Sequence, residues 1–160
     1  MKQYRPNAGI IVFRRDGKVL LCERIENFPK RWQFPQGGLE SGETPLQAAI
    51  RELKEDTSIT SVKFISAYPE PLFYEFPQEI KQSFARNNIL TDGQKQYWHL
   101  FLFEGQENEI NLQTQEPEFR AYKWINIEET TNMVVEFKKQ IYEIIVPAFR
   151  QIIETYLKKL

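Results

Sequence analysis

The stretch from Gly37 to Ile59, GGLESGETPLQAAIRELKEDTSI, constrains this chain more than any other segment. It places three carboxylates, Glu52, Glu55 and Asp56, at helical spacing shortly after a glycine-rich loop. Because a helix turns by about 100° per residue, positions i, i+3 and i+4 share one face. Three acids on one face repel one another unless a cation lies among them. The pattern therefore points to chemistry rather than to packing.

The segment after the loop carries strong helix signals. Thr44 can cap a helix N-terminus, Pro45 suits the first helical position, and Gln47 completes a capping box. These signals predict a helix over residues 45–57. The acids are expected to point away from the core, towards the preceding loop. The apolar stripe expected to be buried consists of Leu46, Ala49, Ile50 and Leu53.

The three acids have the chemistry of a divalent-metal site. Carboxylate oxygens suit Mg²⁺ or Mn²⁺, which prefer hard ligands and retain waters and substrate phosphates. No thiolate or histidine cluster accompanies them, which argues against zinc. Arg51 can pair with Glu43 or Glu55 and hold the acids in place. A solvated acidic helix face is the alternative, because charge runs on helices usually face water.

The stretch resembles the Nudix box, G-x5-E-x7-R-E-U-x-E-E-x-G-U, in which U is a bulky aliphatic residue. The matching residues are Gly37, Glu43, Arg51, Glu52, Leu53, Glu55 and Ile59. Two positions depart from the pattern: Asp56 stands for the second glutamate of a pair, and Ser58 stands for a glycine. Asp56 is still an oxygen ligand, although its reach is one methylene shorter. If Ser58 keeps the left-handed conformation of that glycine, it costs up to about 1–2 kcal/mol.

Composition limits the class of protein. The 160 residues are expected to form one domain, residues 1–160, with a core of its own. The net charge of −1 supplies no strong field for nucleic acid, so contacts with a polyanion must be local. Cys22, the only cysteine, excludes an internal disulfide and is expected to be buried in a strand. No signal segment or membrane span is visible, so we expect a cytoplasmic protein without membrane contact. We also expect a monomer.

The first half of the chain is expected to begin with a hairpin. Ala8–Arg14 and Lys18–Arg24 read as strands that are joined by the turn at Asp16 and Gly17. Further strands are expected at Ser61–Pro69, Tyr97–Glu104 and Ala121–Ile125.

The second half contains the less regular segments. Pro71–Gly93 is expected to be mostly loop with a short helical turn. From about Met133 an apolar period predicts a helix that Pro147 should kink or divide. This order of elements predicts an α+β fold. The resemblance implies more, a Nudix-like α/β/α sandwich with a mixed central sheet and flanking helices.

Segments outside the box resemble the bacterial RNA pyrophosphohydrolases and the related dinucleoside polyphosphate hydrolases. These segments keep their order over nearly the whole chain. They are Tyr4-Arg5-Pro6-Asn7, WQFPQGG at 32–38, Gly93-Gln94-Lys95-Gln96 with Trp98, Thr114, Pro117-Glu118-Phe119, Trp124, Val134-Val135 and Phe137-Lys138. The resemblance implies removal of pyrophosphate from the 5′-triphosphate end of RNA, which initiates RNA decay. Hydrolysis of diadenosine tetra- or pentaphosphate is the alternative, and a Nudix-fold binding module with weakened catalysis is a third.

The same resemblance implies roles for individual residues. Two or three Mg²⁺ or Mn²⁺ ions would be bound by Glu52, Glu55, Asp56, Glu118 and a backbone carbonyl near Gln36 or Gly37. Glu55, Asp56 and Glu118 are all candidates for the general base.

Contacts with the 5′ end of RNA are also implied. Arginine and lysine suit phosphates, and an aromatic ring can stack on a base. The residues implied are Arg5, Arg24, Tyr74, Lys95, Gln96, Val135, Phe137 and Lys138. Core packing is the alternative for Phe137, an edge position for Tyr74 and plain exposure for Lys95. His99, the only histidine, is expected to be structural.

Overall fold

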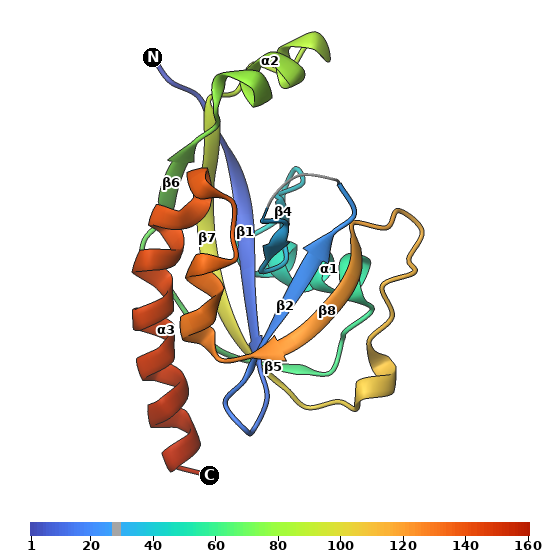
Figure 1. Cartoon of the computed structure of the whole chain (residues 1–160), viewed down its shortest axis with the longest axis vertical. Helices are drawn as coiled ribbons and strands as arrows, with labels where there is room; N and C mark the ends of the chain where they lie inside the picture. Colours follow the sequence, from blue (N-terminus) through green and yellow to red (C-terminus); the bar gives the residue numbers. More distant parts are fainter. Residues whose placement is uncertain (27–29) are drawn as a thin grey trace.

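A mixed sheet forms the centre of the computed structural model, which describes residues 1–26 and 30–160 (Figure 1). The strands are β1 Tyr4–Phe13, β2 Val19–Arg24, β3 Trp32–Gln33, β4 Gln36–Gly38, β5 Val62–Ala67, β6 Leu72–Glu75, β7 Gly93–Phe103 and β8 Phe119–Ile125. Their order is β3-β2-β1-β7-β5, and β4 also pairs with β1, β6 with β7 and β8 with β2. Of the pairings described, only β1–β7 is parallel, and it runs from Tyr4 opposite Gly93 to Phe13 opposite Leu102.

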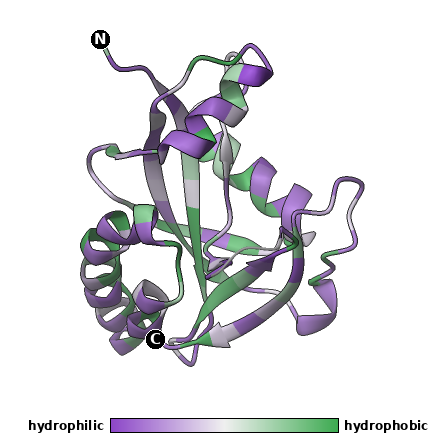
Figure 2. Ribbon diagram, turned by 45° about the horizontal axis from the view of Figure 1, so that its top comes forward, coloured by the Kyte–Doolittle hydropathy of each residue, from purple (hydrophilic) through white to green (hydrophobic). Residues whose placement is uncertain are grey.

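Helices cover both faces of this sheet. The α-helices are α1 Pro45–Thr57, α2 Gln78–Arg86 and α3 Lys139–Lys158, and short 3-10 turns lie at Glu107–Glu109, Ile127–Asn132 and Glu136–Lys138. The core accordingly divides into two apolar clusters, one beneath α3 and one beneath α1. Figure 2 shows apolar strands between helices whose outer faces are polar. The α/β/α sandwich with a mixed sheet is therefore confirmed.

Two elements occupy the segment that was expected to be mostly loop. β6 pairs antiparallel with the start of β7, with Leu72 opposite Gln96 and Glu75 opposite Gly93. The helix α2 then covers one end of the sheet and has no buried residue among its nine. The prediction of a loop for Pro71–Gly93 is thus wrong. A strand of four residues has little local signal of its own, because pairing with β7 stabilises it.

The C-terminal helix also differs from its prediction. It begins at Lys139 rather than near Met133, because 3-10 turns occupy much of the preceding segment. α3 continues through Pro147 as one helix and is not divided there. Pro147 lies on the exposed side, so the carbonyl that loses its helical hydrogen bond can face water.

Burial along α1 corrects the predicted apolar stripe. Ala49 and Leu53 are buried, as is Ala48, whereas Ile50 is 47% exposed. Asp56 is also buried, with 4% of its surface exposed, so the expectation that all three acids point away from the core is wrong. Asp56 follows Leu53 by three positions and therefore lies on the same, buried face.

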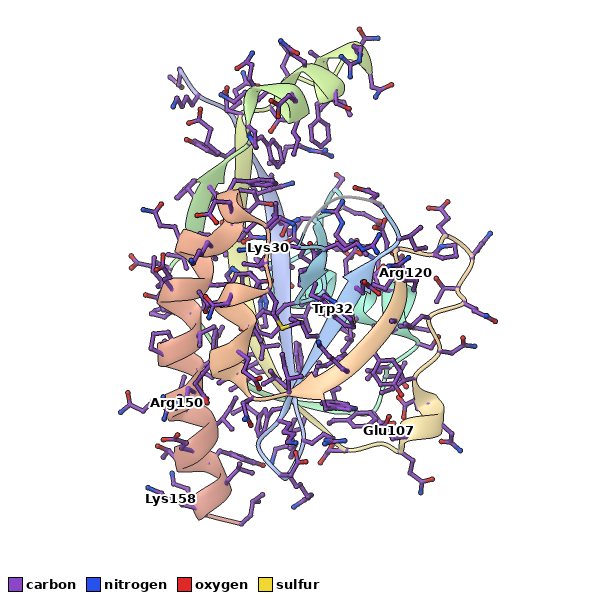
Figure 3. All side chains as sticks on the ribbon, viewed as in Figure 1. Lys30, Trp32, Glu107, Arg120, Arg150 and Lys158 are labelled. Atoms are coloured by element: carbon purple, nitrogen blue, oxygen red, sulfur yellow. The ribbon has the colours of Figure 1, made fainter. Side chains whose placement is uncertain are left out.

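The strand β8 is attached to its neighbours by polar contacts that involve Glu107 and Arg120, which are labelled in Figure 3. Glu107 accepts hydrogen bonds from the Tyr122 hydroxyl at 2.6 Å and from Trp124 Nε1 at 2.7 Å. Arg120 donates two more to the carboxylate of Glu23 on β2. Glu118, directly before β8, is thereby placed at the end of the sheet that holds the box.

Two further predictions concern single residues. Cys22 is fully buried in β2, as expected. His99 is buried in β7 with its Nδ1 3.3 Å from the Gly9 carbonyl, which fits a structural role. Among the helices of the described residues, none has the length and apolar composition needed to cross a membrane.

Candidate active site

The helix α1 is held at both ends by its own sequence. Thr44 and Gln47 form the predicted capping box, in which Gln47 N donates to Thr44 Oγ1 and Thr44 N donates to Gln47 Oε1. At the other end Ser58 has a left-handed backbone with φ of 69°. Its Oγ donates to the Asn111 carbonyl at 2.8 Å. The serine therefore keeps the conformation for which the box normally has glycine.

Arg51 joins the acids to the glycine loop. Its Nε donates to Glu43 Oε2 at 2.6 Å, and its Nη1 donates to Glu52 at 2.9 Å and to Glu55 at 3.1 Å. Its Nη2 donates to Glu43 Oε1 and to the Gly38 carbonyl, the latter at 2.8 Å. The hydrogen bond from Arg51 lowers the pKa of Glu43 to about 2. One guanidinium thus orients three carboxylates and one backbone carbonyl.

Gly37 is required by close approach. A Cβ atom on this residue would lie 2.0 Å from the carboxyl carbon of Glu52. A larger residue would push the Glu52 side chain off the loop. The glycine therefore brings the backbone of the loop against the first acid of α1.

The acids of α1 lack compensation for part of their charge. Burial, together with Glu52, Glu118 and Glu55, raises the pKa of Asp56 to about 8. Burial also raises the pKa of Glu52, against the effect of Arg51. Asp56 Oδ2 is buried and has no hydrogen-bond partner among the described residues. A cation between these side chains would relieve both the repulsion and the unpaired oxygen.

Two adjoining hollows lie beside these residues. The first, named here the acidic hollow, has a volume of about 710 Å³. It is lined by Glu40, Arg51, Glu52, Lys54, Glu55, Asp56, Thr114, Gln115, Glu116 and Glu118. Carboxylates from α1 and from the segment before β8 thus face one space. Two of them, Glu52 and Glu118, are more than 60 positions apart in the sequence.

The second hollow, the inner cavity, has a volume of about 330 Å³. It is lined by Arg24, Gln33, Gln36, Gly37, Gly38, Glu52, Tyr74, Phe76, Ile80, Phe84, Gln94, Glu118, Phe137 and Lys138. Glu52 and Glu118 belong to both hollows. The inner cavity therefore adjoins the carboxylates on one side and extends to α2, at the upper end of Figure 1, on the other.

Most of the residues expected at the site lie around these hollows. Four of those expected to contact RNA line the inner cavity, namely Arg24, Tyr74, Phe137 and Lys138. The remaining four are placed elsewhere. Val135 packs against the apolar cluster beneath α3, and the Lys95 ammonium lies 6.0 Å from the ring centre of Phe73 and 5.7 Å from that of Tyr97.

Gln96 and Arg5 are not among the described residues that line the inner cavity, but each contacts a residue that does. Gln96 is 1% exposed and donates to Asn7 at 2.9 Å and to Gln36 at 3.2 Å, so it holds Gln36 in place. Arg5 lies opposite Gln94 in the sheet, and its guanidinium carbon is 5.7 Å from the ring centre of Phe84.

Sequence reasoning missed two glutamines of the inner cavity. Gln33 accepts a hydrogen bond from Lys138 Nζ at 2.9 Å, and both residues are buried. Burial, and secondarily Arg24, lowers the pKa of Lys138 to about 7. Gln94 Oε1 is buried without a partner among the described residues. Strand alternation would have revealed Gln94, because it shares a face with Gln96 and not with Lys95.

The donor set fits a divalent cation, although it is not arranged as a finished ligand cage. Within residues 1–26 and 30–160, no three histidine, cysteine or acidic side chains already stand at metal-binding spacing. Arg51 instead engages Glu52 and Glu55. The chemistry of the oxygen donors, the unpaired oxygen of Asp56 and the space against Gly37 all suit a hard cation.

Comparison with known proteins agrees with this geometry. A model of the NUDIX domain matches residues 3–145. The RNA pyrophosphohydrolase of Pelagibacter ubique is 41% identical over 139 residues, which cover 87% of this chain and 87% of that protein. That of Caulobacter vibrioides is 41% identical over 150 residues, covering 92% and 87% respectively.

A solved structure supports the same assignment of fold. The dihydroneopterin triphosphate pyrophosphohydrolase of E. coli superposes with a TM-score of 0.67 at 23% identity, covering 99% of this chain and 100% of that one. The match to the NUDIX domain spans most of the chain, and the two relatives are each 41% identical to it over most of their own length. The chain therefore belongs to the Nudix family of hydrolases.

Proposed function

We propose that this chain is a metal-dependent pyrophosphohydrolase that removes pyrophosphate from the 5′-triphosphate end of RNA, and so initiates RNA decay. The observation that carries the proposal is the inner cavity, which joins acids, cations and aromatic rings in one space. Its walls come from β2, β3, β4, α1, β6, α2, β7, the residue before β8 and the turn before α3. The names of the two relatives identical at 41% support the choice of RNA.

The cations of the cavity suit the phosphates. Arg24 offers a permanent charge, whereas Lys138 is buried with a pKa of about 7 and gains its full charge when an anion enters. Gln33 already orients the Lys138 ammonium. Phe137 lies 5.8 Å from Tyr74, ring centre to ring centre, and these rings offer a surface for a base.

The carboxylates suit the divalent ions with which Nudix hydrolases work, and we propose two or three Mg²⁺ or Mn²⁺ ions. Glu52, Glu55, Asp56 and Glu118 would hold them, together with a backbone carbonyl of Gln36 or Gly37. Such ions, when bound, neutralise phosphate charge and make water a better nucleophile. Arg51 and Glu43 keep the carboxylates oriented throughout.

Burial separates the candidates for the general base. Asp56 is enclosed by the core and suits a ligand, because an attacking water needs access. Glu55 is about half exposed, and Glu118 is exposed at the junction of both hollows. We therefore propose that either Glu55 or Glu118 accepts the proton of the attacking water. Proton acceptance by Glu118 predicts that Glu118→Gln loses kcat even when the divalent ion is supplied at saturating concentration.

A competition assay tests the proposed substrate. The protein is offered 5′-triphosphate RNA and diadenosine tetraphosphate together, with Mg²⁺ or Mn²⁺. The proposal predicts that the RNA is consumed faster, that pyrophosphate or orthophosphate is released, and that Glu55→Gln abolishes both turnovers. Preferential hydrolysis of the dinucleotide would favour the alternative, a diadenosine tetra- or pentaphosphate hydrolase. Binding without turnover of either substrate would favour a Nudix-fold binding module with weakened catalysis. The departures from the box at Asp56 and Ser58 are consistent with such a module.

The proposed activity also bears on the cellular location and the oligomeric state of the protein. Transcripts carry their triphosphate in the cytoplasm, so we propose that the chain acts there. We also propose that the chain acts as a monomer.

A further inference from the structure

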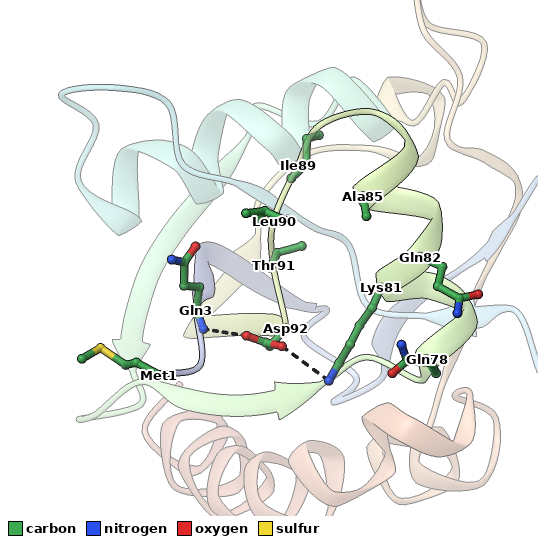
Figure 4. A pocket seen from close by; sticks show the side chains of 10 residues that line it. All are labelled: Met1, Gln3, Gln78, Lys81, Gln82, Ala85, Ile89, Leu90, Thr91 and Asp92. Atoms are coloured by element: carbon green, nitrogen blue, oxygen red, sulfur yellow. Dashed lines mark hydrogen bonds and ion pairs between the residues drawn. The ribbon is translucent and has the colours of Figure 1, made fainter.

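The helix α2 forms one wall of the inner cavity, yet it is only lightly attached to the fold. None of its residues is buried, and its apolar side chains Ile80 and Phe84 point to the cavity. Its other side borders a separate hollow of about 350 Å³ (Figure 4). There Lys81 lies 3.5 Å from Asp92, whose carboxylate also accepts a hydrogen bond from Gln3 N. Polar contacts thus hold α2 from one side and aromatic contacts from the other.

The aromatic contacts of α2 lead from the cavity to Arg5. The Phe84 ring stacks on Phe76, with centres 5.2 Å apart and planes 22° from parallel. Phe76 in turn packs edge-on against Tyr74 and Phe137, both of which line the inner cavity. The Arg5 guanidinium lies over Phe84, at 5.7 Å from the ring centre.

This placement leaves the charge of Arg5 uncompensated. Across residues 1–26 and 30–160, no carboxylate lies within ion-pair distance of its guanidinium. A ring face attracts a guanidinium without occupying its in-plane N–H donors. Arg5 lies opposite Gln94 in the sheet, and Gln94 lines the inner cavity. An arginine held over a ring that lines the cavity keeps its N–H donors available for an anion there.

We propose that Phe84 is a positioning residue that holds the Arg5 guanidinium beside the inner cavity, where it binds the phosphates of the substrate. The inference rests on the proposed function, since it concerns the same substrate. It adds a role for α2, an element outside the box and outside the segments that the resemblance covers. Phe84 acts through Arg5, so its loss should weaken binding of substrate rather than slow the chemical step.

Steady-state kinetics on a short 5′-triphosphate RNA test the proposal. Phe84→Leu, which removes the ring face, should raise KM about threefold to tenfold and change kcat less than about twofold. Phe84→Trp, which retains a ring face, should restore KM to near the wild-type value. Phe64→Leu serves as the matched control, because Phe64 is a partly exposed ring on β5 outside both hollows. Its KM should equal that of the wild type.

A double-mutant cycle separates positioning from a general structural role. In an Arg5→Ala background, Phe84→Leu should raise KM less than about twofold further, because the residue it positions is gone. Full additivity of the two effects, or an unchanged KM in Phe84→Leu, would overturn the proposal. Thermal melting should give intact folds, since α2 has no buried residue, and Phe84→Met replaces any variant that unfolds.

These measurements distinguish a failure of the role proposed for Phe84 from a failure of the proposed function. A wild type that hydrolyses triphosphate RNA, with variants that behave like it, contradicts the role of Phe84 alone. A wild type that does not hydrolyse this RNA contradicts the proposed function. The same cycle is then measured on the affinity for inorganic triphosphate, where coupling between Phe84 and Arg5 supports the positioning role and its absence overturns that role.

Discussion

At the scale of single residues, Ser58 shows how a position made for glycine accepts another side chain. Its φ of 69° lies in the left-handed region, which is unfavourable for residues with a Cβ. The hydrogen bond from its Oγ to the Asn111 carbonyl offsets part of that cost. Ser58 therefore terminates α1 without displacing the acids that precede it.

Substitution at Ser58 tests this balance. Ser58→Ala keeps the backbone strain and loses the hydrogen bond, so it should lower the free energy of unfolding by about 0.5–1.5 kcal/mol. Ser58→Gly loses the same bond but relieves the strain, so it should remain within about 0.5 kcal/mol of the wild type. Urea unfolding measures both. A Ser58→Ala protein as stable as the wild type would show that the hydrogen bond contributes nothing, and one as stable as Ser58→Gly would show that the strain contributes nothing.

Asp56 gives a prediction for pH. Its folded-state pKa of about 8 lies above the unfolded value of about 3.9. The neutral carboxyl therefore contributes stability that is fully present below the unfolded value and is lost as the pH rises through the folded one. In a chelating buffer, the free energy of unfolding of the wild type should fall relative to Asp56→Asn between about pH 5 and pH 8.

Mg²⁺ provides the control for that prediction. At about pH 8 the added ion should stabilise the wild type, whose ionised Asp56 can bind it, much more than Asp56→Asn. Urea unfolding at each pH, with and without the ion, measures the difference. Parallel pH profiles for the two proteins would contradict the raised pKa of this carboxyl.

At the scale of elements, the helix α3 supports the site from the far face of the sheet. The Tyr142 hydroxyl accepts a hydrogen bond from Phe34 N at 2.8 Å, and the two rings stack with centres 5.0 Å apart. Phe34 lies between Gln33 and Gln36, both of which line the inner cavity. α3 thereby holds the strand segments that carry the cavity wall, even though the helix itself contributes no residue to it among those described.

Pro147 allows the continuity of α3 to be tested. The residue is exposed and cannot donate the backbone hydrogen bond that an ordinary residue would give to the Glu143 carbonyl. Pro147→Ala should therefore raise the free energy of unfolding by about 1–3 kcal/mol. Thermal unfolding measures it, with Pro77→Ala at the N-cap of α2 as a control that should change little. Destabilisation by Pro147→Ala would mean that the core requires the geometry imposed by the proline.

The elements differ in how far local sequence determines them. α1 was predictable to the residue because Thr44, Pro45 and Gln47 specify its start by local hydrogen bonds and backbone angles. β6 and α2 were not, because β6 is stabilised by pairing with β7 and α2 by contacts with Phe76 and Asp92. Such partners are distant in sequence, and no local pattern announces them.

At the scale of the whole molecule, the site combines a local part and a distant part. The sequence pattern predicted Glu52, Glu55 and Arg51 correctly as neighbours, because all three lie within α1 at helical spacing. The contact between the buried residues Lys138 and Gln33 could not be predicted from the sequence pattern. These residues are 105 positions apart and meet only when α3 covers the sheet. In the proposed function the reaction type depends on the local part, and the preference for RNA depends on the distant one.

We propose that the carboxylate cluster performs metal-dependent hydrolysis at the 5′ end of RNA. The most direct measurement is the release of labelled pyrophosphate or orthophosphate from γ-labelled 5′-triphosphate RNA, with Mg²⁺ or with chelator. It compares the wild type, Glu52→Gln and the control Glu70→Gln. We expect release by the wild type and by Glu70→Gln only when the ion is present, and at least about a hundredfold loss of rate in Glu52→Gln. Release that persists in chelator, or in Glu52→Gln at the wild-type rate, would contradict it.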